Sequence, residues 1–253
     1  MFKKSLLASA LALLLAGNVF AQDEESEEAT GPWEISADVA LTSDYVFRGV
    51  SQSQEEAALQ AGLNFGHESG FYTGIWGSSI DFTADSTPPA DEDGANVEID
   101  IFVGYGFDIA EDWGADVQLI RYIYPGTNND IDYDYNEFIG SVTYNEMITA
   151  SLGWSNDVFA TSEDGLWLGL SASHDLPWWG LSVNGDVGVY FVDKFDLDGT
   201  DFDYMHYGLG VSKGFGPVTA SLGWANTDND GQNRFPEIAD SRVYLTIEMS
   251  TGL

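Results

Sequence analysis

The chain has 253 residues, of which 28 are glycine and none is cysteine, and it holds 42 Asp and Glu against only 8 Lys and Arg. Because phosphate binding needs clustered Lys and Arg, this balance argues against a nucleic-acid partner. The lack of cysteine excludes disulfides and thiolate metal sites.

The first 21 residues have the pattern of an export signal. Lys3 and Lys4 precede a Leu- and Ala-rich apolar run, and Val19 and Ala21 supply the small residues of a cleavage site after Ala21. The apolar run is too short to remain in a membrane as a helix. Residues 22–32 are acidic and are expected to form a flexible leader.

From Trp33 onward the chain alternates between apolar and polar residues. Between Trp33 and Leu41 every odd position is apolar, whereas Glu34, Ser36 and Asp38 share the other face. A helix would scatter these apolar residues all round its surface, so the alternation predicts β-strands.

Twelve segments carry this pattern, and the connections between them differ in length. The segments are 33–47, 57–67, 71–82, 96–107, 113–124, 133–144, 148–155, 165–173, 180–191, 202–213, 217–224 and 241–249. The long connections are 48–56, 83–95, 125–132, 156–164, 192–201 and 225–240, and they alternate with short turns. An even number of strands with this alternation is typical of a transmembrane antiparallel up-and-down β-barrel with short periplasmic turns and long outer loops. We therefore expect residues 33–253 to form an all-β barrel of about twelve strands in the outer membrane of a Gram-negative bacterium.

Aromatic residues gather at the ends of these segments, which is typical of proteins that meet two membrane interfaces. The expected inner belt is Trp33, Phe71, Trp113, Trp178 and Trp179, and the expected outer belt is Tyr45, Phe82, Tyr124, Trp154, Phe191 and Trp224. A soluble β-sandwich or adhesin module would also show alternating strands. The alternating loop lengths favour the barrel, in which the polar face lines a wet lumen.

Three runs resemble the signatures of a known family. They are Ser43 to Ser53, Gly70 to Ser78, and Tyr122 to Gly126 followed by Glu137. In these three segments the chain resembles the TorF-type porins, which are also called Gcw_chp proteins of uncertain function. The resemblance implies a small outer-membrane barrel that acts as a channel, without a settled substrate.

The predicted lumen face suggests how such a channel would select its solutes. The expected pore-lining residues are Glu34, Asp38, Arg48, Glu98, Asp100, Asp116, Asp186 and His206. Carboxylates dominate this set, so we expect passive or weakly selective diffusion of small solutes with a preference for cations. Arg48 either folds inward to form a constriction with lumen acids or, with Gly49, only marks a bend. A non-conducting structural or adhesion barrel is the alternative function.

The histidines do not indicate an enzyme. His67 and His174 fall in short turns, and His206 lies on the polar face of a strand. A barrel hydrolase needs a serine, a histidine and an orienting acid within hydrogen-bond reach, and no motif suggests that set. We expect no catalytic activity.

One outer loop has the spacing of a calcium-binding loop. Asp228, Asp230 and Glu237 follow the order of ligands in an EF-hand loop, although strands flank them. Acidic loops with glycine are common in barrels, so we interpret the segment as a plain solvated loop, with calcium binding as the alternative. The acidic outer loops would face the negative phosphates of lipopolysaccharide, and the repulsion between them can be relieved in two ways. Ca²⁺ or Mg²⁺ would bridge loop carboxylates to phosphates or to each other, or salt in a saline habitat would screen the loop charges. No other cofactor is expected.

Overall fold

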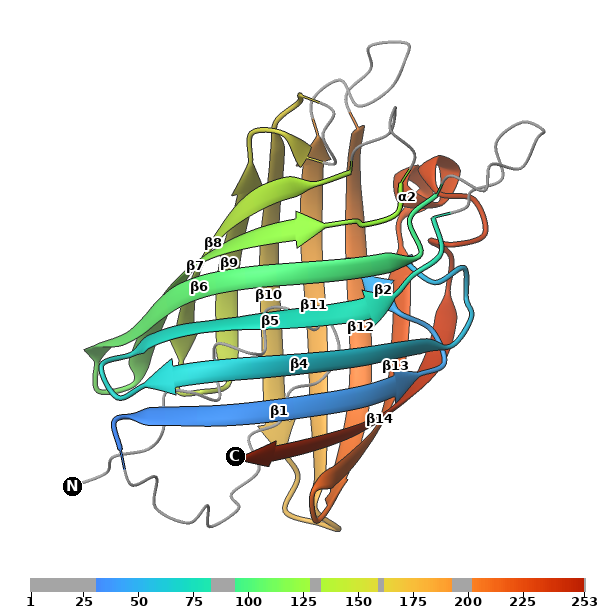
Figure 1. The fold of residues 1–253 in the computed structure, drawn as a ribbon. Coiled ribbons are helices and arrows are strands. Elements are labelled where there is room, and N and C mark those ends of the chain that lie inside the picture. Colours follow the sequence, from blue (N-terminus) through green and yellow to red (C-terminus); the bar gives the residue numbers. More distant parts are fainter. Residues whose placement is uncertain (1–30, 83–93, 128–132, 159–161, 193–201, 253) are drawn as a thin grey trace.

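The computed structural model describes residues 31–82, 94–127, 133–158, 162–192 and 202–252. The predicted signal peptide and nearly all of the predicted acidic leader lie outside these residues. Within them, twelve antiparallel strands close into one barrel (Figure 1), as the alternation predicts. The barrel strands are β1 (Trp33–Thr42), β4 (Ala58–His67), β5 (Phe71–Ser79), β6 (Val97–Ala110), β7 (Trp113–Ile123), β8 (Tyr135–Tyr144), β9 (Ile148–Ser155), β10 (Gly165–Asp175), β11 (Leu181–Val192), β12 (Phe202–Phe215), β13 (Val218–Thr227) and β14 (Arg242–Gly252).

The barrel closes by pairing β1 with both β4 and β14, which leaves no open strand edge. A closed barrel satisfies the backbone hydrogen bonds of every strand without water, which is the condition for crossing a bilayer with strands. No helix among the described residues is both long and apolar enough to span a membrane.

Alternation along each strand divides the side chains between lipid and lumen. Ile101 and Leu245 point outward and are 48% and 49% exposed, whereas Asp100, next to Ile101, is only 2% exposed. Every barrel strand contributes at least one exposed large apolar side chain to the outer surface. Such a continuous apolar surface is stable in a bilayer and not in water.

The first strand is shorter than its predicted span of 33–47. β1 ends at Thr42, and the chain then turns into the barrel as a small hairpin of β2 (Val46–Phe47) and β3 (Val50–Ser51). Its two-residue loop, Arg48-Gly49, has positive φ at both positions, which is the backbone of a tight hairpin turn. Residues 48–56 were predicted to form a loop that extends outward from the barrel. That prediction is wrong, because the hairpin folds into the lumen. The segment 43–56 is here called the lumenal hairpin. Its middle part, around β2 and β3, lies inside the barrel (Figure 1), whereas Ser43, Glu55 and Glu56 at its two ends are exposed.

The predicted outer connection 225–240 contains a short helix, α2 (Asn229–Arg234), that alternation could not reveal. Asp228 caps it, because the Asp228 carboxylate accepts a hydrogen bond of 3.0 Å from the backbone N–H of Gly231. Part of the segment is thus helical where the sequence predicts only a loop.

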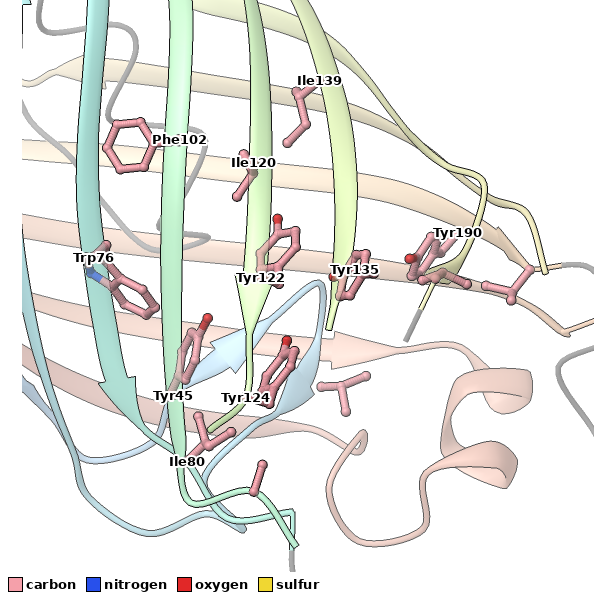
Figure 2. Close-up of a cluster of buried hydrophobic side chains, with 14 of the residues drawn as sticks. Tyr45, Trp76, Ile80, Phe102, Ile120, Tyr122, Tyr124, Tyr135, Ile139 and Tyr190 are labelled. Atoms are coloured by element: carbon pink, nitrogen blue, oxygen red, sulfur yellow. The ribbon is translucent and has the colours of Figure 1, made fainter. Parts of the chain in front are cut away.

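The lumen is filled on one side. Aromatic and apolar side chains from β5 to β8 pack together with residues of the lumenal hairpin and of β11, and they point toward one another inside the barrel (Figure 2). Tyr45 and Tyr124 belong to this cluster with exposures of 6% and 4%. Their assignment to the outer aromatic belt is therefore wrong, whereas Trp154, at 45% exposure, does lie on the outer surface. The reason for Tyr45 is that the chain turns inward after β1, whereas Tyr124 directly follows β7 and keeps the inward alternation of Tyr122.

The wall formed by the inner parts of β10 and β11 is more open. Ser171 and Ser173 on β10 face inward and are exposed, and the side chain of Asp186 on β11 is 32% exposed. Water therefore reaches the inner half of the lumen along β10 and β11.

Candidate functional site

Arg48, at the tip of the lumenal hairpin, pairs with Glu137 on β8. Arg48 Nη2 lies 2.8 Å from Glu137 Oε1 and 2.9 Å from Oε2, and the two side chains are 4% and 1% exposed. The Tyr122 hydroxyl also donates to Glu137 Oε2, at 3.0 Å. Since β8 lies almost opposite β1 in the closed strand order, this ion pair pins the hairpin tip to the far wall.

Three aromatic rings complete the surroundings of the Arg48 guanidinium. Its central carbon lies 4.6 Å from the ring centroid of Phe47, 4.4 Å from that of Trp167 and 5.0 Å from that of Tyr190. These distances are within the range of cation–π attraction. We call Glu137, Phe47, Trp167 and Tyr190 the cation cage.

The backbone of the hairpin tip also contacts β12 and β13. A Cβ atom added at Gly49 would lie 2.7 Å from the Cβ of His206 and 2.8 Å from Cγ2 of Thr227. Only glycine fits such a close approach, and Gly49 also has a φ of +83°. The lumenal hairpin therefore reaches across the barrel to several strands, and Arg48 folds inward onto a lumen acid. Its role in a constriction stays a prediction.

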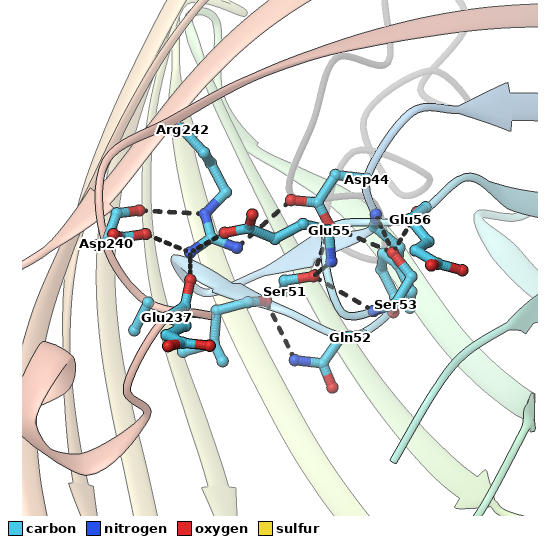
Figure 3. Close-up of polar contacts among 12 residues, drawn as sticks. Asp44, Ser51, Gln52, Ser53, Glu55, Glu56, Glu237, Asp240 and Arg242 are labelled. Carbon is cyan, nitrogen blue, oxygen red and sulfur yellow. Dashed lines mark hydrogen bonds and ion pairs between the residues drawn. The ribbon is translucent and has the colours of Figure 1, made fainter. Parts of the chain in front are cut away.

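A second arginine holds the base of the hairpin (Figure 3). Arg242 on β14 lies 3.4 Å from Asp44, 3.5 Å from Glu55 and 3.2 Å from Asp240, measured between guanidinium nitrogens and carboxylate oxygens. The hydroxyls of Ser51 and Ser53 donate to Asp44 Oδ1. We call Arg242 and its three carboxylate partners, Asp44, Glu55 and Asp240, the base latch.

The predicted pore-lining acids all lie on inward positions, but water reaches few of them. Glu98, Asp100 and Asp116 are 3%, 2% and 7% exposed, and tyrosine hydroxyls donate to two of them, Tyr124 to Glu98 at 3.2 Å and Tyr72 to Asp116 at 2.9 Å. Asp38 is also buried and accepts from Asn64, whereas Glu34 is exposed at the inner mouth and Asp186 is partly exposed. Whether these residues conduct ions stays a prediction.

Sequence reasoning missed the partner of Arg48. Glu137 is absent from the predicted pore-lining set, although it closes the third family signature. Its inward position on β8 follows from alternation, but its contact with a residue 89 positions away does not. The resemblance was therefore the one signal that could have singled out Glu137.

His206 is held by two neighbours. The indole N–H of Trp167 donates to His206 Nε2 at 2.9 Å, and Nδ1 lies 3.3 Å from a carboxylate oxygen of Asp186. A hydrolytic triad would need a hydroxyl or thiol nucleophile where the indole lies. The arrangement therefore orients the histidine without supplying a nucleophile.

The predicted calcium ligands have other surroundings in the structure. Asp228 caps α2, Asp230 lies in the first turn of that helix, and Glu237 follows it with a φ of +71°. Among the described residues, no group of three or more acidic or histidine side chains is placed to hold a metal ion. Binding of Ca²⁺ or Mg²⁺ at these residues stays a prediction.

Several solved structures share this fold. The COG4313 outer membrane channel from Pseudomonas putida F1 has a TM-score of 0.54 and 11% identity, covering 92% of this chain and 100% of that one. The NanC porin has a TM-score of 0.54 and 8% identity, covering 87% and 100%. The KdgM porin has a TM-score of 0.50 and 7% identity, covering 85% and 99%. At these identities the likeness establishes an outer-membrane barrel fold.

The sequence itself matches one family model. No curated protein sequence matches the chain. The model described as "Bacterial protein of unknown function (Gcw_chp)" matches residues 26–251. The resemblance of the three sequence signatures is thereby confirmed, and the chain belongs to the Gcw_chp family of bacterial proteins.

Proposed function

We propose that this protein is an outer-membrane channel of a Gram-negative bacterium through which small solutes diffuse passively, with a preference for cations. The lumenal hairpin forms the narrowest part of its path. Interior width grows with strand number, and a barrel of about twelve strands lies between the filled barrels of about eight and the open porins of about sixteen. A narrow path beside the hairpin is consistent with that width.

The charge of the lumen carries this proposal. Arg48 and Arg242 are the two arginines that reach the lumen in the described residues, and carboxylates neutralise both of them. The wet inner half carries Glu34, Asp186 and Glu248 on inward positions, with no arginine or lysine beside them among the described ion pairs. A lumen lined by carboxylates that no arginine or lysine neutralises lowers the energy of cations and raises that of anions.

Single-channel recording in planar bilayers tests the proposal. Across a KCl gradient, the purified barrel should show a small conductance whose reversal potential lies toward the potassium equilibrium potential. Glu248→Gln removes one lumenal charge and should weaken this preference. The matched change Glu146→Gln, in an exposed turn between β8 and β9, should leave it unaltered. A reversal potential toward that of chloride would contradict cation selection.

The span of the lumenal hairpin favours a second candidate, a non-conducting structural or adhesion barrel. The hairpin contacts strands on both sides of the lumen, which is how a permanent plug would be held. This function predicts no conductance from the native barrel and none after the base latch is removed by Arg242→Ala. A native barrel that conducts would exclude it.

A further inference from the structure

We infer that the cation cage is a binding site for small organic cations with a guanidinium or ammonium head, which Arg48 occupies while the lumenal hairpin is docked. The inference rests on the proposed channel function and names its class of solute. The cage is built by the barrel wall, since Glu137, Trp167 and Tyr190 come from β8, β10 and β11. Phe47 is the one member that moves with the hairpin.

The chemistry of the cage suits an organic cation better than a bare metal ion. Aromatic faces attract cations that carry little water, such as guanidinium and alkylammonium groups. Glu137 supplies a carboxylate with both oxygens directed at the guanidinium, and the Tyr122 hydroxyl orients it. A planar donor that bonds both oxygens would gain strength and direction from this arrangement.

Arg48 is an imperfect occupant of its own cage. Its φ of 47° is a left-handed backbone conformation that a residue with a Cβ disfavours. A free guanidinium compound would make the same contacts without that backbone strain. A solute can therefore compete with Arg48, even though Arg48 is attached to the chain.

Charge compensation couples binding of the solute to movement of the hairpin. Glu137 is 1% exposed, so withdrawal of Arg48 would leave a buried carboxylate unpaired, which is strongly unfavourable. A cation that enters as Arg48 leaves removes that penalty, whereas a neutral or anionic solute does not. The cage thus favours displacement of the hairpin by cations of the right shape.

Isothermal titration calorimetry on the refolded full-length mature barrel tests the site without requiring conduction. The probe is methylguanidinium chloride, with urea as the uncharged planar control and NaCl as the control for charge alone. Arg48→Ala should bind methylguanidinium saturably and more tightly than the native protein, in which Arg48 competes. Adding Glu137→Gln to that variant should weaken binding by about tenfold or more, because a charge-assisted hydrogen bond is lost.

Three results would overturn the inference: equal binding by the single and double variants, equal heats from methylguanidinium and urea, or no saturable binding by Arg48→Ala. If Arg48→Ala fails to fold alone, it is refolded in methylguanidinium chloride, and recovery of the native near-UV circular dichroism with methylguanidinium but not with urea or NaCl becomes the measurement. Binding without conductance would support the cage and contradict the channel. Conductance without binding would support the channel and contradict the cage.

Discussion

Gly153 on β9 faces the ion pair between Arg48 and Glu137. A Cβ atom at this position would lie 2.6 Å from Glu137 Oε1 and 3.2 Å from Arg48 Nη2, so even the smallest side chain would displace the carboxylate. We expect Gly153→Ala to lower the free energy of unfolding by about 1–3 kcal/mol, the usual cost of overpacking. Urea unfolding in detergent micelles would measure the loss, and single-channel recording should show a larger conductance as the hairpin tip loosens.

Gly114 on β7 provides the matched control. It also lies on an inward position of a barrel strand, but an added Cβ would meet no heavy atom within 4 Å. Gly114→Ala should therefore leave both stability and conductance nearly unchanged. An equal decrease in the free energy of unfolding in the two variants would show that both positions need glycine for backbone reasons. The space that Gly153 leaves for the ion pair would then not explain its effect.

At the scale of elements, the lumenal hairpin depends on the base latch. Arg242→Ala leaves Asp44, 5% exposed, without its guanidinium partner, and breaking a buried ion pair costs about 3–5 kcal/mol. Release of the hairpin base relieves that cost, so we expect a larger single-channel conductance together with faster proteolysis within residues 43–56.

Arg121→Ala is the control for the loss of an arginine. Arg121 lies on the outward face of β7, pairs with Asp134 at 3.0 Å and has a side chain that is 41% exposed. An exposed pair of this kind contributes about 0–1 kcal/mol, so stability and conductance should stay close to native. If Arg121→Ala opened the channel as much as Arg242→Ala, the base latch would have no special role.

The segment around α2 permits a test of divalent cations at the outer loops. Because the Asp228 carboxylate already caps the helix, we expect general screening of the acidic surface and not a specific Ca²⁺ site. Thermal unfolding in EDTA at low salt should show a loss of stability that NaCl restores as fully as millimolar Ca²⁺. Rescue by Ca²⁺ alone would instead support ligation by Asp228, Asp230 and Glu237.

For the whole molecule, the division into lipid-facing and lumen-facing surfaces determines which positions tolerate a charged side chain. Ile101→Arg places a cation on the outward face near the middle of β6, where it should cost about 2–4 kcal/mol. Ser171→Arg is the matched control, because Ser171 is exposed to the wet side of the lumen and lies opposite Asp186. Unfolding from lipid vesicles in urea should separate the two variants, and equal costs would contradict the assignment of outward and inward faces.

The sequence by itself determined the number of barrel strands, their approximate positions, the face that residues within those strands present and the family. These are local properties, because period-two alternation and turn lengths can be read within a single segment. Trp33, Trp113 and Trp154 could be placed at the outer surface for the same reason. Alternation also placed Asp100 and Asp186 on inward positions, but it could not show that only Asp186 meets water.

The tertiary structure alone decided what fills the lumen. Whether residues 43–56 extend outward or fold inward depends on Arg48 meeting Glu137, and on Arg242 meeting Asp44 across 198 positions of sequence. Such contacts balance the cost of burying charge against the strength of a well-placed ion pair, and that balance exists only once the barrel has closed. Tyr45 lies inside the barrel for the same reason, because the hairpin carries it there.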